Sequence, residues 1–195
     1  RAPFVAVSIA ASTGGPAAVI QIFQRLERLD NAAFFVVVHG PGWMLEAFAR
    51  RLSENAAMPV ALADEGQLVA PGRIYVAPGA CHTELLPGQT RLRLVDGPPE
   101  NYVRPAADPL FRSVARNFGR SVVGVVLTGL GRDGADGCDH IAAAGGKVIV
   151  QDPASAIAPY MPQSVLSLGI DADVASPTDL PQLITRHVRG RSVGG

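Results

Sequence analysis

A serine, a histidine and an aspartate each follow an apolar run of this sequence, at Ser12, His39 and Asp133. A serine hydroxyl becomes a good nucleophile when an imidazole accepts its proton, and a carboxylate holds that imidazole in the required tautomer. These three side chains therefore form the set needed for attack on a carbonyl carbon. Each also has a plainer interpretation, because a serine before two glycines is often a turn residue or a phosphate ligand, and Asp133 suits a helix cap.

The segment around Ser12 predicts a strand that passes through a tight turn into a helix. Residues 5–11 are mostly apolar, and Ser12 and Thr13 are followed by two glycines and a proline. Glycine allows backbone angles that larger residues resist, and proline fits the first helical position, where no N–H is needed. The start of a helix favours negative charge through its free N–H groups and its dipole. We therefore expect a bound phosphate or a developing oxyanion beside Ser12.

The elements that must position these residues alternate between buried strands and amphipathic helices. Apolar runs predict strands at residues 5–11, 33–38, 59–63, 122–127 and 147–150. Apolar residues spaced by three or four predict helices after Pro16, Gly42, Pro105 and Gly134, a short helix at 163–168, and a last helix capped by Ser176. This alternation predicts an α/β fold, a three-layer α/β/α arrangement around a mostly parallel, doubly wound sheet.

Residues 69–95 have a different pattern. Short alternating runs at 74–76, 82–86 and 91–95 are separated by Pro-Gly turns. Such punctuation is typical of antiparallel hairpins, so we expect a hairpin insertion in the strand-helix chain.

The predicted topology brings the three chemical residues to one edge of the sheet. Sites in such sheets form at the carboxyl ends of the strands, near the point where the strand order reverses. Ser12, His39 and Asp133 all follow predicted strands. We therefore expect all three side chains on the same rim.

The size and charge of the chain limit its organisation and its partners. A length of 195 residues predicts one domain over 1–195, with a flexible tail at 190–195. The first residue is Arg1 and a strand follows almost at once, which indicates a domain of a longer protein. Lys and Arg number 17 and so do Asp and Glu, so no nucleic-acid partner is expected.

The lengths of the apolar runs and the spacing of the cysteines predict a cytoplasmic protein that binds no metal ion. No run approaches the roughly 20 residues that span a bilayer, and no signal segment is evident, so we expect no membrane insertion. Cys81 and Cys138 lie far apart without CxxC spacing, which favours reduced thiols. Neither the pair Cys81 and His82 nor the pair Cys138 and His140 has the usual spacing of zinc ligands, so no metal is expected.

Five sequence blocks follow one another over nearly the whole chain. They are A-S-T-G-G-P at 11–16, V-V-V-H at 36–39 with F-A-R-R-L at 48–52, G-R-I-Y-V-A-P-G at 72–79, R-P-A-A-D-P-L-F-R-S at 104–113, and L-T-G-L-G-R-D-G-A-D-G at 127–137. In this order they resemble the catalytic domain of the CheB chemotaxis receptor methylesterases. The ordered set is far more specific than any single motif.

The resemblance implies a role for each candidate residue. Ser12 corresponds to the nucleophile, His39 to the general base and Asp133 to the carboxylate that orients it. Thr13 and the backbone of Leu130 correspond to groups that stabilise the oxyanion. Two further candidates for oxyanion or substrate binding are Gly14, in the turn, and Arg104, which is either an exposed loop residue or a contact to an acidic flank of the substrate.

The resemblance also implies a reaction and its partners. The reaction is hydrolysis of glutamyl γ-methyl esters on the cytoplasmic helices of methyl-accepting chemotaxis receptors, with methanol as product, and a related deamidation of glutamine. It needs no metal or organic cofactor. The full-length members of this family usually carry a regulatory receiver domain upstream, so we expect one here.

Two other interpretations stay open at this point. One keeps the fold and drops the chemistry, as a signalling or docking module in which Gly40, Arg132 and the polar region at Cys138 are signs of drift. In that view Arg132 competes for Asp133, whereas in an active enzyme it would meet acidic receptor side chains. The other uses the Ser12 turn as a phosphate cradle for a nucleotide, although no G-x-G-x-x-G motif or Walker lysine is present.

Overall fold

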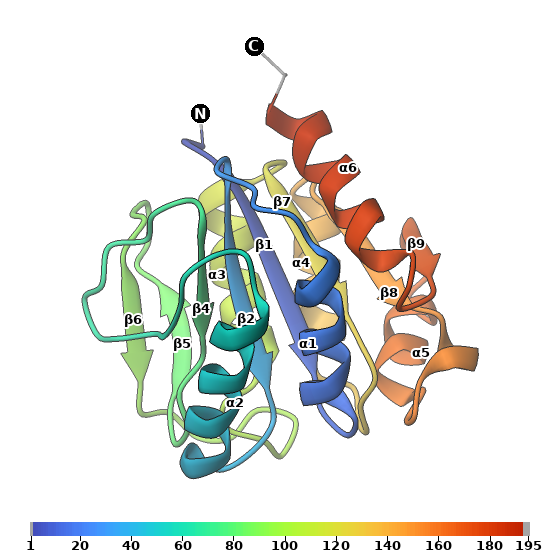
Figure 1. Ribbon diagram of the computed structural model, residues 1–195, viewed down its shortest axis with the longest axis horizontal. Helices are drawn as coiled ribbons and strands as arrows, with labels where there is room; N and C mark the ends of the chain where they lie inside the picture. The colour runs from blue at the N-terminus through green and yellow to red at the C-terminus, as the bar shows by residue number, and fades with distance from the viewer. Residues whose placement is uncertain (1, 193–195) are drawn as a thin grey trace.

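Seven parallel strands form the central sheet of the computed structural model, which describes residues 2–192 (Figure 1). Across the sheet they are β3 (Val60–Leu62), β4 (Arg73–Val76), β2 (Ala32–Val38), β1 (Val5–Ala11), β7 (Val122–Val126), β8 (Lys147–Gln151) and β9 (Ala172–Ala175). Every neighbouring pair is parallel. The strands β1, β2 and β7 are buried over their whole length, which explains why their sequences are continuous apolar runs.

Helices cover both faces of the sheet and make three layers. One face carries α1 (Gly15–Arg25), α2 (Gly42–Asn55) and α6 (Leu180–Ser192), which lie in front of the strands in Figure 1. The other face carries α3 (Ala107–Phe118), α4 (Ala135–Ala143), α5 (Tyr160–Leu166) and the antiparallel pair β5 (His82–Leu85) and β6 (Leu92–Val95). A single 3₁₀ turn, η1 (Pro153–Ser155), follows β8. The predicted three-layer α/β/α fold is confirmed.

Alternate residues of β1 belong to the two cores. Val7 and Ile9 pack with α1, α2 and α6, whereas Ala6 and Ala10 face the side of α3 and α4. The larger side chains thus fill one core, and the small ones allow α3 and α4 to approach the sheet closely. This packing fixes β1 in the middle of the molecule, and the residue that follows it is Ser12.

The prediction of a hairpin strand at 74–76 is wrong. β4 lies in the parallel sheet, where Ile74 is opposite Phe34 of β2 on one side and Val60 of β3 on the other. Ile74, Tyr75 and Val76 are all buried because both faces of this strand are covered, so the run does not alternate as a half-exposed hairpin strand would. The antiparallel hairpin expected from 82–86 and 91–95 is confirmed as β5 and β6.

The C-terminal elements begin at other residues than the sequence predicts. The edge strand β9 is missed because it is only partly buried and carries Asp173, so it shows no apolar run. α5 begins at Tyr160, and Pro162 fits into its first turn, where no N–H is needed. Ser176 accepts a hydrogen bond from Asp179 N at 3.3 Å, as expected of a cap, but the α-helix itself begins at Leu180.

α6 extends into the segment predicted to be a flexible tail. Residues 190–192 are its last helical residues, and residues 193–195 lie outside the part of the chain that the structure describes. None of the described helices has both the length and the hydropathy needed to cross a bilayer.

Candidate active site

The strand order of the sheet reverses beside β1. Backbone hydrogen bonds there link the carboxyl ends of β1, β2 and β7. From β1 the chain passes to β2 and the strands beyond it, and then returns to β7 on the other side. His39 N donates to Ala11 O at 3.1 Å, and Ser12 N donates to Thr128 O at 2.9 Å. Ser12 therefore lies at the switch point of the sheet, where sites of α/β proteins form. The predicted placement of Ser12 and His39 on one rim agrees with this geometry.

The turn after Ser12 has a conformation that requires glycine. Gly15 N donates to Ser12 O at 2.7 Å, and Gly14 has a φ of 77°. A side chain at Gly14 would also come within 2.8 Å of Ile157 Cδ1. The Gly-Gly pair therefore allows the sharp turn that presents Ser12 at the start of α1.

The segment that follows β7 contacts the Ser12 turn and stabilises it. The buried Thr128 donates through Oγ1 to Thr13 O at 2.8 Å and accepts from Ala158 N at 3.0 Å. A Cβ atom at Gly129 would lie 2.8 Å from Ser12 Cβ and would overlap with Met161 Sδ. Gly129 thus allows the loop after β7 to pass directly against Ser12. Sequence reasoning missed Thr128, although it stands within the block at 127–137.

His39 and Asp133 form a short hydrogen bond. The distance between His39 Nε2 and Asp133 Oδ2 is 2.6 Å, and the Asp133 side chain is 1% exposed. Because the carboxylate is an acceptor, Nε2 carries the proton and the neutral ring keeps Nδ1 as its acceptor. Within residues 2–192, Ser12 Oγ has no hydrogen bond to this ring. The ring nitrogen available to a serine is therefore Nδ1.

The Asp133 carboxylate is also bonded to the first N–H groups of α3. Ala107 N donates to Oδ2 at 2.6 Å and Asp108 N donates to Oδ1 at 3.1 Å. Burial alone would raise the pKa of Asp133, but the hydrogen bond from His39 and those from the two backbone groups lower it below its ordinary value. Asp133 is therefore ionised at neutral pH and can stabilise a positive charge on His39.

A second buried carboxyl group, Asp108, lies beside Asp133. Its Oδ1 accepts from Gly134 N at 2.9 Å and from Gly137 N at 2.8 Å, and its Oδ2 accepts from Asn101 Nδ2 at 2.8 Å. Burial and the negative charge of Asp133 raise the pKa of Asp108 to about 6. Sequence reasoning singled out neither Asp108 nor Asn101. The block at 104–113 contains Asp108, whereas no local pattern points to Asn101.

The remaining predicted residues occupy the rim and its surroundings. Thr13 is exposed and Leu130 is 54% exposed, and within residues 2–192 neither backbone N–H donates a hydrogen bond. Arg104 Nη1 donates to Gly97 O at 2.8 Å and lies 3.2 Å from Asp96 Oδ1, so its side chain is tied to the loop after β6. Arg132 is exposed and is not among the donors to Asp133.

The cysteine and histidine pairs considered as metal ligands include side chains that are buried or already hydrogen-bonded. Cys138 is buried beside Gly124, and burial raises the pKa of its thiol above the ordinary value. His82 is held by Pro98 O at 2.8 Å and by Ala106 N at 3.1 Å. Among the described residues, no three His, Cys, Asp or Glu side chains are arranged to hold a metal ion.

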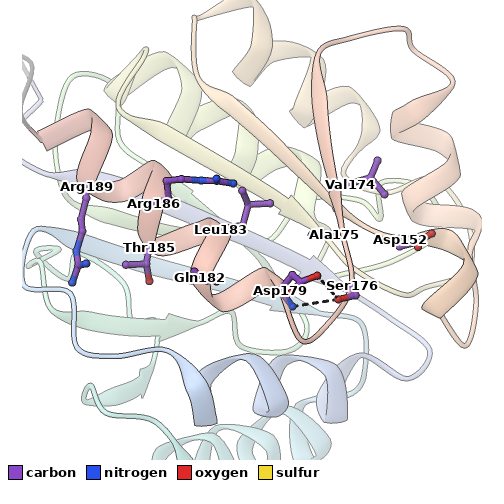
Figure 2. A pocket seen from close by; sticks show the side chains of 10 residues that line it. All are labelled: Asp152, Val174, Ala175, Ser176, Asp179, Gln182, Leu183, Thr185, Arg186 and Arg189. Carbon is purple, nitrogen blue, oxygen red and sulfur yellow. Dashed lines mark hydrogen bonds between the residues drawn. The ribbon is translucent and has the colours of Figure 1, made fainter.

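A hollow of about 860 Å³ lies elsewhere, beside β9 and α6 (Figure 2). The residues that line it are Asp152, Val174, Ala175, Ser176, Asp179, Gln182, Leu183, Thr185, Arg186 and Arg189. Figure 2 shows the cap hydrogen bonds between Ser176 and Asp179 at its edge. None of Ser12, His39 and Asp133 lines this hollow, so it is distinct from the strand-end site.

The family model for CheB methylesterase matches residues 7–184. The chain belongs to the CheB methylesterase family. It is 39% identical over 193 residues to a protein-glutamate methylesterase/protein-glutamine glutaminase of Pyrococcus abyssi, covering 98% of this chain and 52% of that protein. A protein of the same name from Pectobacterium atrosepticum is 39% identical over 190 residues, covering 96% of this chain and 53% of that protein.

A crystal structure of the Thermotoga maritima CheB methylesterase catalytic domain has the same fold. Its TM-score is 0.87 at 31% sequence identity, over 93% of this chain and 97% of that chain. The chain thus spans about half the length of the curated relatives that it matches, at 52% and 53%, and nearly all of this solved CheB catalytic domain.

Proposed function

We propose that this chain is a serine hydrolase that removes methyl groups from glutamyl γ-methyl esters of chemoreceptors. The observation that carries the proposal is the 2.6 Å bond between His39 and Asp133, next to the strand end that presents Ser12. The names of the relatives supply the substrate class, and they extend it to glutamine side chains. We include this deamidation in the proposal.

In the first half of the reaction, Ser12 Oγ attacks the ester carbonyl carbon. The hydroxyl proton passes to His39 Nδ1, and the Asp133 carboxylate stabilises the imidazolium through Nε2–H. The tetrahedral intermediate collapses when the C–OCH₃ bond breaks and the leaving oxygen takes the proton from Nδ1. Methanol departs and the glutamyl group remains bound to Ser12 as an ester.

In the second half, water replaces the methanol. A water molecule attacks the glutamyl ester while its proton passes to His39 Nδ1. Breakage of the bond to Ser12 Oγ returns that proton to the serine and releases the glutamate side chain. The enzyme is restored without a cofactor in either step.

The backbone N–H groups of Thr13 and Leu130 are the proposed oxyanion donors. Thr13 lies in the turn after Ser12 and Leu130 lies in the loop after β7. Within residues 2–192 neither N–H group donates a hydrogen bond. Gly14 allows the left-handed backbone conformation of the Ser12 turn. The dipole of α1 places partial positive charge at the start of this helix, and that charge stabilises the oxyanion. A donor of this kind contributes about 3 to 4 kcal/mol to lowering the barrier.

The proposal includes partners of the whole protein. Because the relatives are about twice as long as this chain, we propose that the full-length protein carries a regulatory receiver domain. We place it in the cytoplasm, where its proposed substrates lie. Its substrates are the cytoplasmic helices of methyl-accepting chemotaxis receptors, and exposed Arg132 and Arg104 are candidate contacts for their acidic residues.

Methanol release from a methylated receptor tests the proposal. The unaltered protein should release methanol, and Ser12→Ala should reduce the rate to background. Ser53→Ala is the matched control, because Ser53 is exposed on α2. Equal turnover by Ser12→Ala would exclude Ser12 as the nucleophile. Receptor binding by the unaltered protein without any methanol release would favour the docking module instead.

A further inference from the structure

The turn that carries Asn101 has an unusual and well-defined backbone. Glu100 N donates to Val103 O at 3.1 Å, and Val103 N donates to Glu100 O at 3.0 Å. The two residues between them, Asn101 and Tyr102, have φ angles of 52° and 66°. Positive φ at both central positions matches a type I′ turn, in which asparagine is favoured. The direction of the Asn101 side chain is thus set by a tight turn rather than by a loose loop.

Arg112 links this turn to α3 and α4, the two helices next to Asp133. Its Nη2 donates to both carboxylate oxygens of Glu100, at 2.7 and 2.9 Å, and its Nη1 donates to Asp136 Oδ2 at 2.8 Å. Arg112 belongs to α3 and Asp136 to α4. A guanidinium that bridges two carboxylates restricts the geometry of both. The turn is therefore positioned relative to the helices that hold Asp133.

Asn101 links the two buried carboxyl groups. Its Nδ2 donates to Asp108 Oδ2 at 2.8 Å and lies 3.3 Å from Asp133 Oδ1. An amide nitrogen has two protons, so one is available for each carboxylate. Two negatively charged groups repel one another at this range, and the shared donor offsets part of that repulsion.

Each carboxyl group also caps the helix that begins next to the other. Asp133, just before α4, accepts from Ala107 N and Asp108 N at the start of α3. Asp108, in the first turn of α3, accepts from Gly134 N and Gly137 N at the start of α4. The helices approach closely enough that a Cβ at Gly137 would overlap with Phe111. Any rotation of either carboxyl group would break a helix cap.

We propose that Asn101 is a positioning residue of the active site, whose amide holds the Asp133 carboxylate in the orientation that bonds His39. Asp108 is the anchor of this amide. The inference rests on the proposed function, since the orientation of Asp133 matters to turnover only if His39 is the base. In support, the bond from Asn101 lowers the pKa of Asp108, opposing the larger effects of burial and of the Asp133 charge.

Asn101→Gly is the test variant, because glycine accepts a positive φ and only the amide is removed. With a methylated receptor as substrate, kcat should fall about 10- to 100-fold while KM stays within about twofold, since Asn101 acts on the geometry of the reacting groups. In proton NMR spectra, the low-field signal of His39 Nε2–H should shift or broaden. This signal reports the bond to Asp133 whether or not the protein is active.

Asn117→Ala is the matched control. Asn117, near the end of α3, also donates through Nδ2 to loop acceptors, Leu86 O at 2.7 Å and Gln89 O at 2.9 Å, in the hairpin of β5 and β6. Its replacement should leave both kcat and the His39 signal unchanged. A second test variant is Asn101→Asp, because aspartate tolerates the positive φ and places a third carboxylate between the other two. We expect a larger loss of kcat from it than from Asn101→Gly.

The outcomes separate this inference from the proposed function. Unchanged kcat and an unchanged His39 signal in both Asn101 variants would overturn the inference, even with Ser12→Ala inactive. A fall in kcat that the Asn117→Ala control shares would also overturn it, because the effect would then be one of stability. If Ser12→Ala is as active as the unaltered protein, the proposed function fails, and the NMR signal still decides whether Asn101 orients Asp133.

Discussion

Two histidine–aspartate pairs of almost equal length occur in this protein. His39 Nε2 lies 2.6 Å from Asp133 Oδ2, and His187 Nε2 lies 2.7 Å from Asp173 Oδ2. The first pair joins the end of β2 to the residue just before α4, near the middle of the sheet. The second joins α6 to β9 at the edge of the sheet, and Lys147 Nζ lies 3.1 Å from the other oxygen of Asp173.

The two pairs differ in what surrounds the carboxylate. The Asp133 side chain is 1% exposed and is bonded to backbone N–H groups, whereas the Asp173 side chain is 35% exposed and its charge is balanced by Lys147. Solvent and a cation weaken the influence of Asp173 on His187, while Asp133 has no such competitor among its donors. A short histidine–aspartate distance is therefore insufficient to define an active site. Burial of the carboxylate and its position at the switch point of the sheet distinguish the first pair.

Asparagine in place of each aspartate gives the sharpest contrast between the pairs. Asp133→Asn should lower kcat for methyl ester hydrolysis by about 10³- to 10⁴-fold, because the amide no longer holds the reactive tautomer of His39. Asp173→Asn should change kcat by less than about twofold. Methanol release at saturating receptor measures both. Comparable losses in the two variants would contradict the distinction.

Alanine in place of glycine tests how closely each region is packed. Gly129→Ala places a Cβ against Ser12 Cβ and Met161 Sδ, so it should lower kcat about 100-fold and the free energy of unfolding by about 1 to 3 kcal/mol. Gly190, on α6 near the second pair, has no atom within 4 Å of an added Cβ. Gly190→Ala should leave kcat unchanged and raise helix stability slightly. Denaturant unfolding and methanol release distinguish the two outcomes.

The smallest expected effect concerns pH. The pKa of Asp108 is raised in the folded protein to about 6, so between about pH 4 and 6 the folded state binds more protons than the unfolded state. Relative to Asp108→Asn, the unaltered protein should therefore gain about 1 kcal/mol of unfolding free energy as pH falls from 7 to 5. Urea unfolding at both pH values measures this difference.

Asp173 provides the control with the opposite sign. Burial would raise its pKa, but bonds from His187 and Lys147 lower it below the ordinary value. Its stabilising contribution is present at neutral pH and is lost as pH falls below about 4, through the folded pKa. Relative to Asp173→Asn, the unaltered protein should show no gain between pH 7 and 5. A gain as large as that for Asp108 would contradict these assignments.

The sequence predicts the parts of the site but not how they are joined. Apolar runs before Ser12 and His39 locate strand ends, and all ends of parallel strands face one edge, so a shared rim is predictable. The position of β1 between β2 and β7 is not predictable, because no local pattern encodes strand order. The same limit hides the place of β4 between β3 and β2, because its short run between Pro-Gly turns also fits a hairpin strand.

Residues that act through turns are still harder to predict. Asn101 reaches Asp133 only because Arg112 fixes Glu100 and because two successive residues have positive φ. Arg132 shows the reverse case, since its neighbour Asp133 suggests a competing ion pair that its exposed side chain does not form. Adjacency in sequence is thus a poor guide to contact at this rim, where side chains of successive residues diverge.

β1 lies between β2, which is synthesised soon after it, and β7, which is synthesised much later. This order decides when the site can form. The Ser12 turn emerges from the ribosome before Thr128, which bonds Thr13 O and lies 115 residues further along the chain than Thr13. Asp133 and the start of α3, whose N–H groups donate to it, also come from the later part. A nascent chain therefore holds Ser12 and His39 before the groups that make them reactive have been synthesised. The complete site can form only after this later part of the chain has been synthesised.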